Sequence, residues 1–331
     1  SIDTSNRVDY WDNWDPQYGY FSFGELGFVP MENRWYSWNP TQSATQYPKG
    51  KAKFLPKNAK LLLHIHYGPT GVPAKDSSFI KLKFAEKTVE KIIQTAPLIG
   101  LHNLTNDTFL IPENETVRFH AKFTVPYDLE LFSLMPHSHY LARKWEIFTV
   151  EPETRKAETL LKITDWDFHW KQNFECQKPK ILKKGTVIHA LAEYDNSLNN
   201  LANPSEPPRE MTWGKRMYEE LFLVYFSFVP YSEKEQGKSF FEILPTATNI
   251  SRPIFKLPFS TQKKGEFSLS IFNFAGEKVL SVFENQTFQK GRHDIQIDFS
   301  ELEQGNYYFE LEINEMKIPR VFIFLKKEYY D

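Results

Sequence analysis

The sequence of 331 residues contains one cysteine and only 14 glycines, and its net charge is only −2. One cysteine excludes an internal disulfide framework and a cysteine-based zinc site. The small net charge gives no electrostatic basis for binding nucleic acid or an anionic membrane. No apolar run reaches the roughly 20 residues that a membrane-spanning helix needs. We therefore expect neither a nucleic-acid-binding nor a membrane-spanning protein.

The sequence also lacks the usual motifs of hydrolases and nucleotide-binding enzymes. It shows no Ser-His-Asp or Cys-His arrangement, no glycine loop that could hold a phosphate and no paired carboxylates. The chain begins at Ser1 with no Met and no signal peptide, so we expect a processed or truncated product.

Aromatic residues are abundant, with 29 Phe, 16 Tyr and 8 Trp. Such side chains pack well on half-buried pleated surfaces and favour strands over helices. Short runs of alternating or apolar residues, bounded by Pro, Gly, Asn or Asp, follow one another along most of the chain. One short helix is expected at Ala85–Thr95. The fold class predicted is all-β.

The strand pattern divides the chain into four parts. We expect a first jelly roll over residues 1–115, incomplete at its N-terminus, and a second jelly roll over residues 116–232. A polar linker over residues 233–264 leads to a small Ig-like sandwich over residues 265–331, where six or seven short strands are predicted. The predicted architecture is thus two jelly-roll sandwiches side by side plus a C-terminal Ig-like sandwich.

Two His-x-His motifs are the clearest chemical signals. On a strand, residues i and i+2 point to the same face, so His137 and His139 can offer two imidazoles to one ion. His64 and His66 form a second such pair, on an apolar strand, where one histidine can equally serve a hydrogen bond inside a core. Neutral imidazole is a ligand for copper or zinc.

Ordered blocks from about residue 15 to residue 230 resemble the ascorbate-dependent type II copper monooxygenases, the peptidylglycine and dopamine monooxygenase family, in its bacterial branch. The blocks are Tyr47-Pro48-Lys49-Gly50, Leu55-Pro56-Lys57-Asn58, His66-Tyr67-Gly68-Pro69-Thr70-Gly71, Asp76-Ser77-Ser78, Pro136-His137-Ser138-His139, Trp166-Asp167-Phe168-His169-Trp170, Lys184-Gly185-Thr186, Tyr194-Asp195-Asn196-Ser197, Asn203-Pro204, and Trp213-Gly214 with Glu219-Glu220-Leu221.

The resemblance implies one or two copper ions facing each other across a cleft, with ascorbate as the reductant if the chain is active. His137 and His139 match the His-x-His of the oxygen-binding copper, and His66 matches a histidine of the electron-transfer copper. Tyr225 matches a substrate-binding tyrosine. We expect His66 and the His137/His139 pair to face a common cleft.

The sequence departs from the family in its ligand set. The thioether position of the oxygen-binding copper falls on Leu221, and Met217 is the nearest alternative sulfur along the chain. The adjacent histidine pair of the electron-transfer copper is absent from residues 1–65, and family spacing would place it just before Ser1. Met135 and Leu223 stand where the family has an arginine and an asparagine, which argues against a peptidylglycine substrate.

The C-terminal block, from Ser270 to Tyr308, resembles the Ig-like tails of Bacteroidetes secreted proteins, some of which are type IX sorting domains. This resemblance implies a protein of the periplasm, outer membrane or cell surface, with a protein partner there.

Three interpretations follow: an active copper hydroxylase whose missing histidine pair lies upstream, a copper-binding protein without turnover, and an accessory interaction module of a surface assembly. The ligand losses favour the last two.

Overall fold

The structure is a computed structural model. It describes residues 1–3, 7–16, 19–20, 35–39, 42–55, 57–65, 67, 70–87, 89–106, 108–125, 127–214, 216, 218–231, 241–243, 249–250, 253–261, 264–273, 277–303, 305–313 and 316–324. The described chain is mostly β-structure arranged in several sheets, so the predicted all-β class is confirmed.

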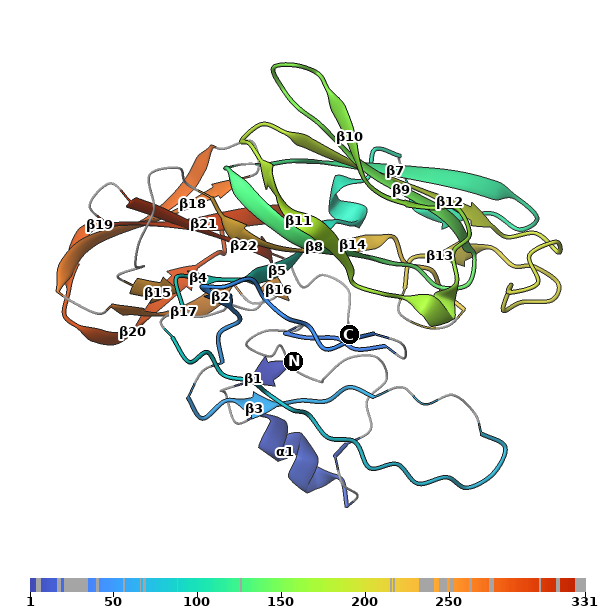
Figure 1. Cartoon of the computed structure of the whole chain (residues 1–331), viewed down its shortest axis with the longest axis horizontal. Coiled ribbons are helices and arrows are strands. Elements are labelled where there is room, and N and C mark those ends of the chain that lie inside the picture. The colour runs from blue at the N-terminus through green and yellow to red at the C-terminus, as the bar shows by residue number, and fades with distance from the viewer. Residues whose placement is uncertain are drawn as a thin grey trace.

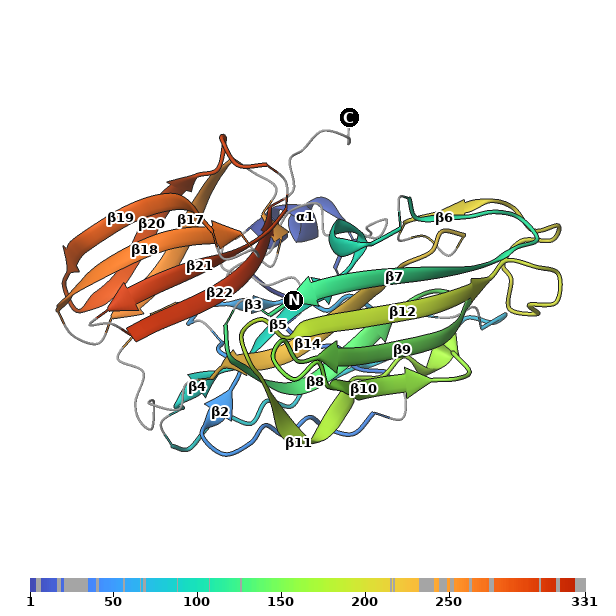
Figure 2. The same cartoon turned by 90° about the horizontal axis from the view of Figure 1, so that it is seen from above.

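The central unit is a sandwich of two four-stranded antiparallel sheets (Figures 1 and 2). The first sheet has the order β10-β9-β12-β7, made of β7 (Thr116–Thr124), β9 (Ala142–Val150), β10 (Ala157–Ile163) and β12 (Val187–Asp195). The second has the order β11-β8-β14-β5, made of β5 (Gln94–Ile99), β8 (Leu129–His137), β11 (Phe174–Leu182) and β14 (Leu223–Pro230). Two short 3-10 helices, η1 (Leu101–Asn103) and η2 (Phe168–Trp170), and the pair β6 (Leu110–Ile111) and β13 (Met211–Thr212) lie among the connections.

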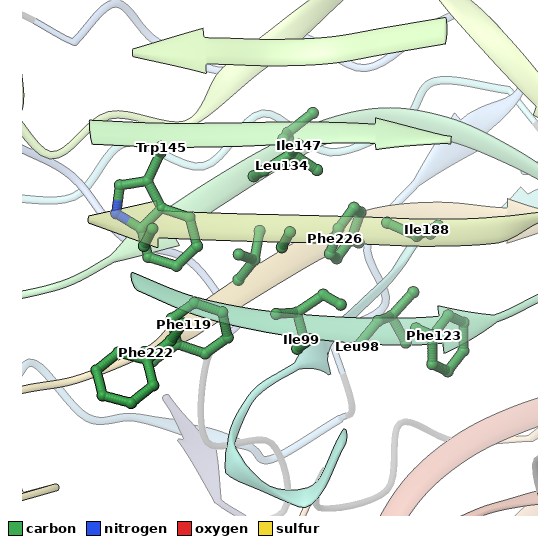
Figure 3. Close-up of a cluster of buried hydrophobic side chains, with 14 of the residues drawn as sticks. Leu98, Ile99, Phe119, Phe123, Leu134, Trp145, Ile147, Ile188, Phe222 and Phe226 are labelled. Carbon is green, nitrogen blue, oxygen red and sulfur yellow. The ribbon is translucent and has the colours of Figure 1, made fainter. Parts of the chain in front are cut away.

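Alternation along the strands builds the core between these sheets. Every second residue of β12 is buried, which is the pattern of a strand with one face on a core. Trp145 of the first sheet stacks on Phe222, with ring centroids 5.0 Å apart, and both side chains are fully buried. Figure 3 shows these rings together with Phe226 and Ile188 inside the sandwich. The apolar faces of the two sheets therefore pack against each other.

The C-terminal unit is a second sandwich of a three-stranded and a five-stranded sheet, as expected for an Ig-like tail. Its orders are β15-β17-β20 and β16-β22-β21-β18-β19, with β15 (Phe241–Ile243), β16 (Asn249–Ile250), β17 (Ile254–Thr261), β18 (Gly265–Asn273), β19 (Lys278–Phe288), β20 (Gly291–Asp298), β21 (Gly305–Ile313) and β22 (Met316–Phe324). Its own core is rich in phenylalanine. Tyr308 also packs against Tyr127 of the central unit, with ring centroids 5.7 Å apart, so the two sandwiches touch.

The N-terminal part contains little regular structure among its described residues. It has one helix, α1 (Arg7–Trp14), and the two-residue strands β1 (Ile2–Asp3), β2 (Lys51–Ala52), β3 (Lys60–Leu61) and β4 (Lys91–Ile92). The described residues before β5 therefore do not build the jelly roll expected over residues 1–115. Instead β5 pairs with β14, so the sheets join residues on both sides of the expected boundary at residue 116.

Two further expectations need correction. Strands β15 and β17 lie inside the stretch expected as a linker, residues 233–264, because both pair into the C-terminal sandwich. The helix expected at Ala85–Thr95 is wrong, because β4 lies in this stretch and β5 begins there at Gln94. The reason is tertiary: β4 pairs with β2, and the stretch ends in β5, the edge strand of the second sheet of the central sandwich, so strand pairing overrides local helix propensity.

Candidate functional site

His137 and His139 lie where β8 ends. His137 is the last residue of the strand and pairs with Leu223 of β14, while His139 follows in the turn toward β9. The two imidazole rings are 5.9 Å apart between centroids and inclined by 66°. His137 is half-buried and His139 is 4% exposed. The sequence motif thus places both rings within reach of one small ion.

The ring of His139 is fixed by the backbone of the segment before β14. Its Nδ1 lies 2.7 Å from the carbonyl oxygen of Glu219. Because a carbonyl only accepts, Nδ1 carries the hydrogen and the lone pair of the neutral ring is on Nε2. Burial lowers the pKa of His139, and the Glu219 carbonyl opposes this in part. The neutral, oriented imidazole is the form that binds metals.

Glu220 holds the turn that carries His139. Its carboxylate accepts hydrogen bonds from the backbone N–H groups of His139 at 2.8 Å, Leu141 at 2.8 Å and Leu221 at 3.1 Å. The side chain is 1% exposed. Burial raises the pKa of Glu220 to about 7, although the three N–H donors favour its charged form. One buried acid therefore joins the β8–β9 turn to the segment before β14.

Three more hydrogen bonds close the same turn. Ser138 Oγ and the Tyr194 hydroxyl both donate to the Leu221 carbonyl, at 2.9 and 2.8 Å. The two hydroxyl oxygens lie 2.9 Å from each other. Trp166 Nε1 donates to the His139 carbonyl at 3.0 Å. All of these atoms are buried, so the turn is held by bonds that water does not compete for.

Strand alternation places Leu221, Leu223 and Tyr225 on the face beside the histidines. Phe222, Val224 and Phe226 are buried in the core of the sandwich, so alternate residues of this segment face opposite sides. Leu223 and Tyr225 are half-buried on the opposite face, and Leu221 is 6% exposed. The position that would carry a thioether is thus a buried hydrocarbon side chain with no lone pair.

Tyr225 and Met135 line a cavity of about 200 Å³ on the outer face of the second sheet. They are direct neighbours across β14 and β8, two positions before the Leu223–His137 pair. Ser37 Oγ lies 3.7 Å from Met135 Sδ, so the N-terminal segment covers this part of the sheet. The predicted substrate-binding tyrosine therefore lies in a pocket close to the histidine pair.

Of the remaining predicted ligands, the structure describes only His64. His66 and Met217 lie outside the described residues, so the expected common cleft between His66 and the His137/His139 pair stays a prediction. His64 is exposed, in the stretch after β3. Among the described residues, no group of three or more His, Cys, Asp or Glu side chains could hold a metal ion.

The sequence did not reveal that Glu219 and Glu220 position His139. It also did not reveal that N-terminal residues line the cavity. The buried Glu220 had one signal in the sequence, an acid directly before an apolar run. The wall residues had none, because they precede β8 by about 90 positions and meet it only in the folded chain.

Comparison with known proteins gives one assignment. Residues 251–324 match the secretion system C-terminal sorting domain, the tail of proteins exported by type IX secretion. The chain is therefore an extracytoplasmic protein of the cell surface or outer membrane. No family match supports the resemblance to copper monooxygenases. No curated protein matches the chain. In the described residues, no helix is both long and apolar enough to cross a membrane.

Among solved structures, a β-glucuronidase of Faecalibacterium prausnitzii matches with 10% identity and a TM-score of 0.19. The match covers 73% of this chain and 47% of that protein, so this chain spans about half of its length. At this TM-score the likeness carries no argument about fold or function.

Proposed function

We propose that this chain is an exported accessory module of a surface or outer-membrane assembly, and that it binds one copper ion at His137 and His139 without turnover. The observation that supports the copper part is the oriented imidazole pair. An ion about 2.0–2.1 Å from one nitrogen of each ring leaves the ring centroids about 5–6 Å apart. The two centroids are 5.9 Å apart.

The donor set fits a two-imidazole copper site better than a hydroxylase site. The Glu219 carbonyl orients His139 as outer groups orient metal-binding histidines in proteins. Cu(I) prefers a soft thioether as an additional ligand, and the family position for it is the buried Leu221. We therefore derive no hydroxylation step and assign the two histidines to binding alone, with water completing the shell.

The accessory part of the proposal rests on an exposed apolar surface between β3 and β4, which we call the β3–β4 surface. Its large exposed side chains are Leu63, Ile65, Tyr67, Val72, Phe79, Ile80, Leu82 and Phe84. In Figure 1 this part of the chain runs out as a long extended loop away from the sandwiches. Exposed apolar patches of this kind mark contact sites for other proteins.

The copper part is tested by metal analysis of the full chain after equilibration with copper(II). We expect about one ion per chain, and its loss from the His137→Ala/His139→Ala variant. His293→Ala, in the C-terminal sandwich, is the matched control and should keep the ion. An unchanged stoichiometry in the double variant refutes the assignment. Ascorbate-dependent, product-coupled oxygen consumption by the unmodified chain refutes the absence of turnover.

The accessory part is tested by retention at the cell surface. Phe79→Ser/Phe84→Ser should leave the chain exported and folded but release it from the surface assembly. Leu201→Ser changes another exposed apolar side chain, 98% exposed, in the connection between β12 and β13, and should be retained. Equal retention of both variants contradicts a contact through the β3–β4 surface.

A further inference from the structure

The cavity on the outer face of the second sheet has a polar floor that crosses all four strands. Glu175 of β11 pairs with Ser133 of β8, which pairs with Ser227 of β14. Ser227 in turn pairs with Thr95 of β5, and their hydroxyl groups lie 3.0 Å apart. All four residues line the cavity. A sheet face that only packs against protein would carry apolar residues here, as the opposite face does.

The walls add aromatic rings to this floor. Trp35, Tyr36, Tyr47 and Tyr225 all line the cavity. The indole N–H of Trp35 donates to the Phe54 carbonyl at 3.0 Å, so the ring carbons are what it can offer a ligand. The Tyr36 hydroxyl accepts from Thr45 at 3.3 Å, which leaves its own hydrogen available as a donor.

Gln42 supplies the observation that points to a ligand. It lines the cavity, and its side-chain oxygen Oε1 is buried without a hydrogen-bond partner among the described residues. Buried polar atoms without a partner are uncommon in proteins, because each forfeits its hydration. A ligand that donates a hydrogen bond from within the cavity would give Gln42 Oε1 its partner.

The remaining side chains define the chemistry of that ligand. Gln46, Asn173 and Gln177 add three more carboxamides, and Lys53 and Glu175, of opposite sign, are the charged side chains among the described lining residues. Carboxamides and hydroxyls both donate and accept, which matches sugar hydroxyls, and the C–H faces of a sugar ring pack on aromatic rings. Among the described residues of the lining there is no arginine, the residue that recognises phosphate and carboxylate in a bidentate manner.

We propose that this cavity binds a neutral saccharide, with one sugar ring between the aromatic walls and a hydroxyl donating to Gln42 Oε1. The lining lies close to the histidine pair but includes neither His137 nor His139, so the proposed sugar binding does not depend on copper. It would give the exported chain a means of holding a glycan at the cell surface.

The test is calorimetric titration of the full chain with glucose, galactose, mannose and N-acetylglucosamine and with cellobiose, lactose and chitobiose. At least one sugar should bind at millimolar concentration or below. Gln42→Leu and Trp35→Ala should each weaken that binding about tenfold or more, which is the range for a lost buried hydrogen bond or a lost stacking contact. Gln286→Leu and Trp170→Ala, outside the cavity, are the matched controls and should bind as the unmodified chain does.

Circular dichroism shows whether each variant is folded, and saturation-transfer NMR with the unmodified chain tests sugar binding independently if one is not. No sugar bound by the unmodified chain overturns the proposal, as does equal affinity in a folded Gln42→Leu and Trp35→Ala. Binding of a neutral tripeptide amide in place of every sugar also overturns it. Copper binding without sugar binding refutes this proposal and leaves the histidine assignment intact.

Discussion

The central sandwich carries two histidine pairs, and they differ in what the imidazoles do with each other. His137 and His139 lie on one strand end, with inclined rings whose centroids are 5.9 Å apart. His120 of β7 and His189 of β12 lie on neighbouring strands of the other sheet. Their rings are nearly parallel, and His120 Nε2 lies 2.9 Å from His189 Nδ1. In the second pair one nitrogen of each ring is hydrogen-bonded to the other ring, whereas in the first pair the ring of His139 is held by the Glu219 carbonyl.

The comparison shows that proximity alone does not make a pair of histidines a metal site. In the first pair Glu219 and Glu220 orient the turn from outside the pair. In the second pair the hydrogen bond between the rings must break before either of the two nitrogens can bind an ion. The side chain of Lys122 also lowers the pKa of both histidines, after the larger effect of burial, so a cation is already near.

The largest expected effect is the loss of Glu220. Glu220→Ala leaves three backbone N–H groups without their acceptor in a buried turn, and should lower the free energy of unfolding by about 3–5 kcal/mol. It should also abolish copper binding, because the His139 turn loses its support. Denaturant unfolding and metal analysis check this. Glu219→Ala, which keeps the carbonyl that accepts from His139, should cost less than about 1 kcal/mol; an equal cost would contradict the role given to Glu220.

A pH titration of stability isolates the same carboxyl group. Its folded-state pKa of about 7 lies above the ordinary value of 4.5, so the folded chain holds the proton more tightly. The stability from this group is fully present below about pH 4.5 and is lost as the pH rises through 7, by about 3 kcal/mol at most.

Glu220→Gln is the non-titrating reference for this measurement. The difference in free energy of unfolding between the unmodified chain and Glu220→Gln should shift in favour of the variant between about pH 5 and pH 7. The histidines contribute equally to both chains and cancel. A constant difference across this range would mean that Glu220 keeps an ordinary pKa in the folded chain.

Copper binding should distinguish the two histidine pairs by a smaller change in the free energy of unfolding. At a tenfold excess of copper over its dissociation constant, binding to the native state stabilises it by about 1.4 kcal/mol. Thermal unfolding with and without copper should show this gain in the unmodified chain and in His120→Ala/His189→Ala, and not in His139→Ala. A gain that follows the second pair would transfer the metal site to the other sheet.

Much of the sandwich could be predicted from the sequence because its central strands alternate. The alternating or apolar runs Val117–Val125, Leu129–Leu134 and Val187–Tyr194 fall on β7, β8 and β12. The edge strands β10 and β11 carry a weaker pattern. Most residues of β10 are exposed, and β11 contains Pro179 and an irregular register, both features of sheet edges, where the apolar pattern weakens.

The candidate site was predictable only where its residues are neighbours in sequence. The spacing of His137 and His139 and the parity of Leu223 and Tyr225 could be inferred from strand geometry. The second histidine pair is separated by 69 positions, and Gln42 reaches its place over β8 from a segment with little periodicity. Such contacts depend on the tertiary fold, which no local pattern encodes.

The smallest expected effect concerns the hydrogen bond between His120 and His189. Burial is the main cause that lowers the pKa of both rings, so the folded chain favours their neutral forms. Stability from this pair is present above about pH 6.5 and is lost as the pH falls, because protonation removes the acceptor nitrogen and places two charges beside Lys122. Both rings are partly exposed, and solvent screening keeps the contribution well below 1 kcal/mol.

His189→Leu keeps the packing on Phe148, whose ring stacks on His189 with centroids 4.8 Å apart, and removes the hydrogen bond. The variant should be slightly less stable than the unmodified chain at pH 8 and equal to it or more stable at pH 5, in urea unfolding at both values. His293→Leu, in the C-terminal sandwich, is the control for the removal of a histidine elsewhere in the chain. If His189→Leu lost the same stability at both pH values, the pair would act through packing alone. Only the copper measurement would then distinguish the His120/His189 pair from the proposed ion-binding pair His137/His139.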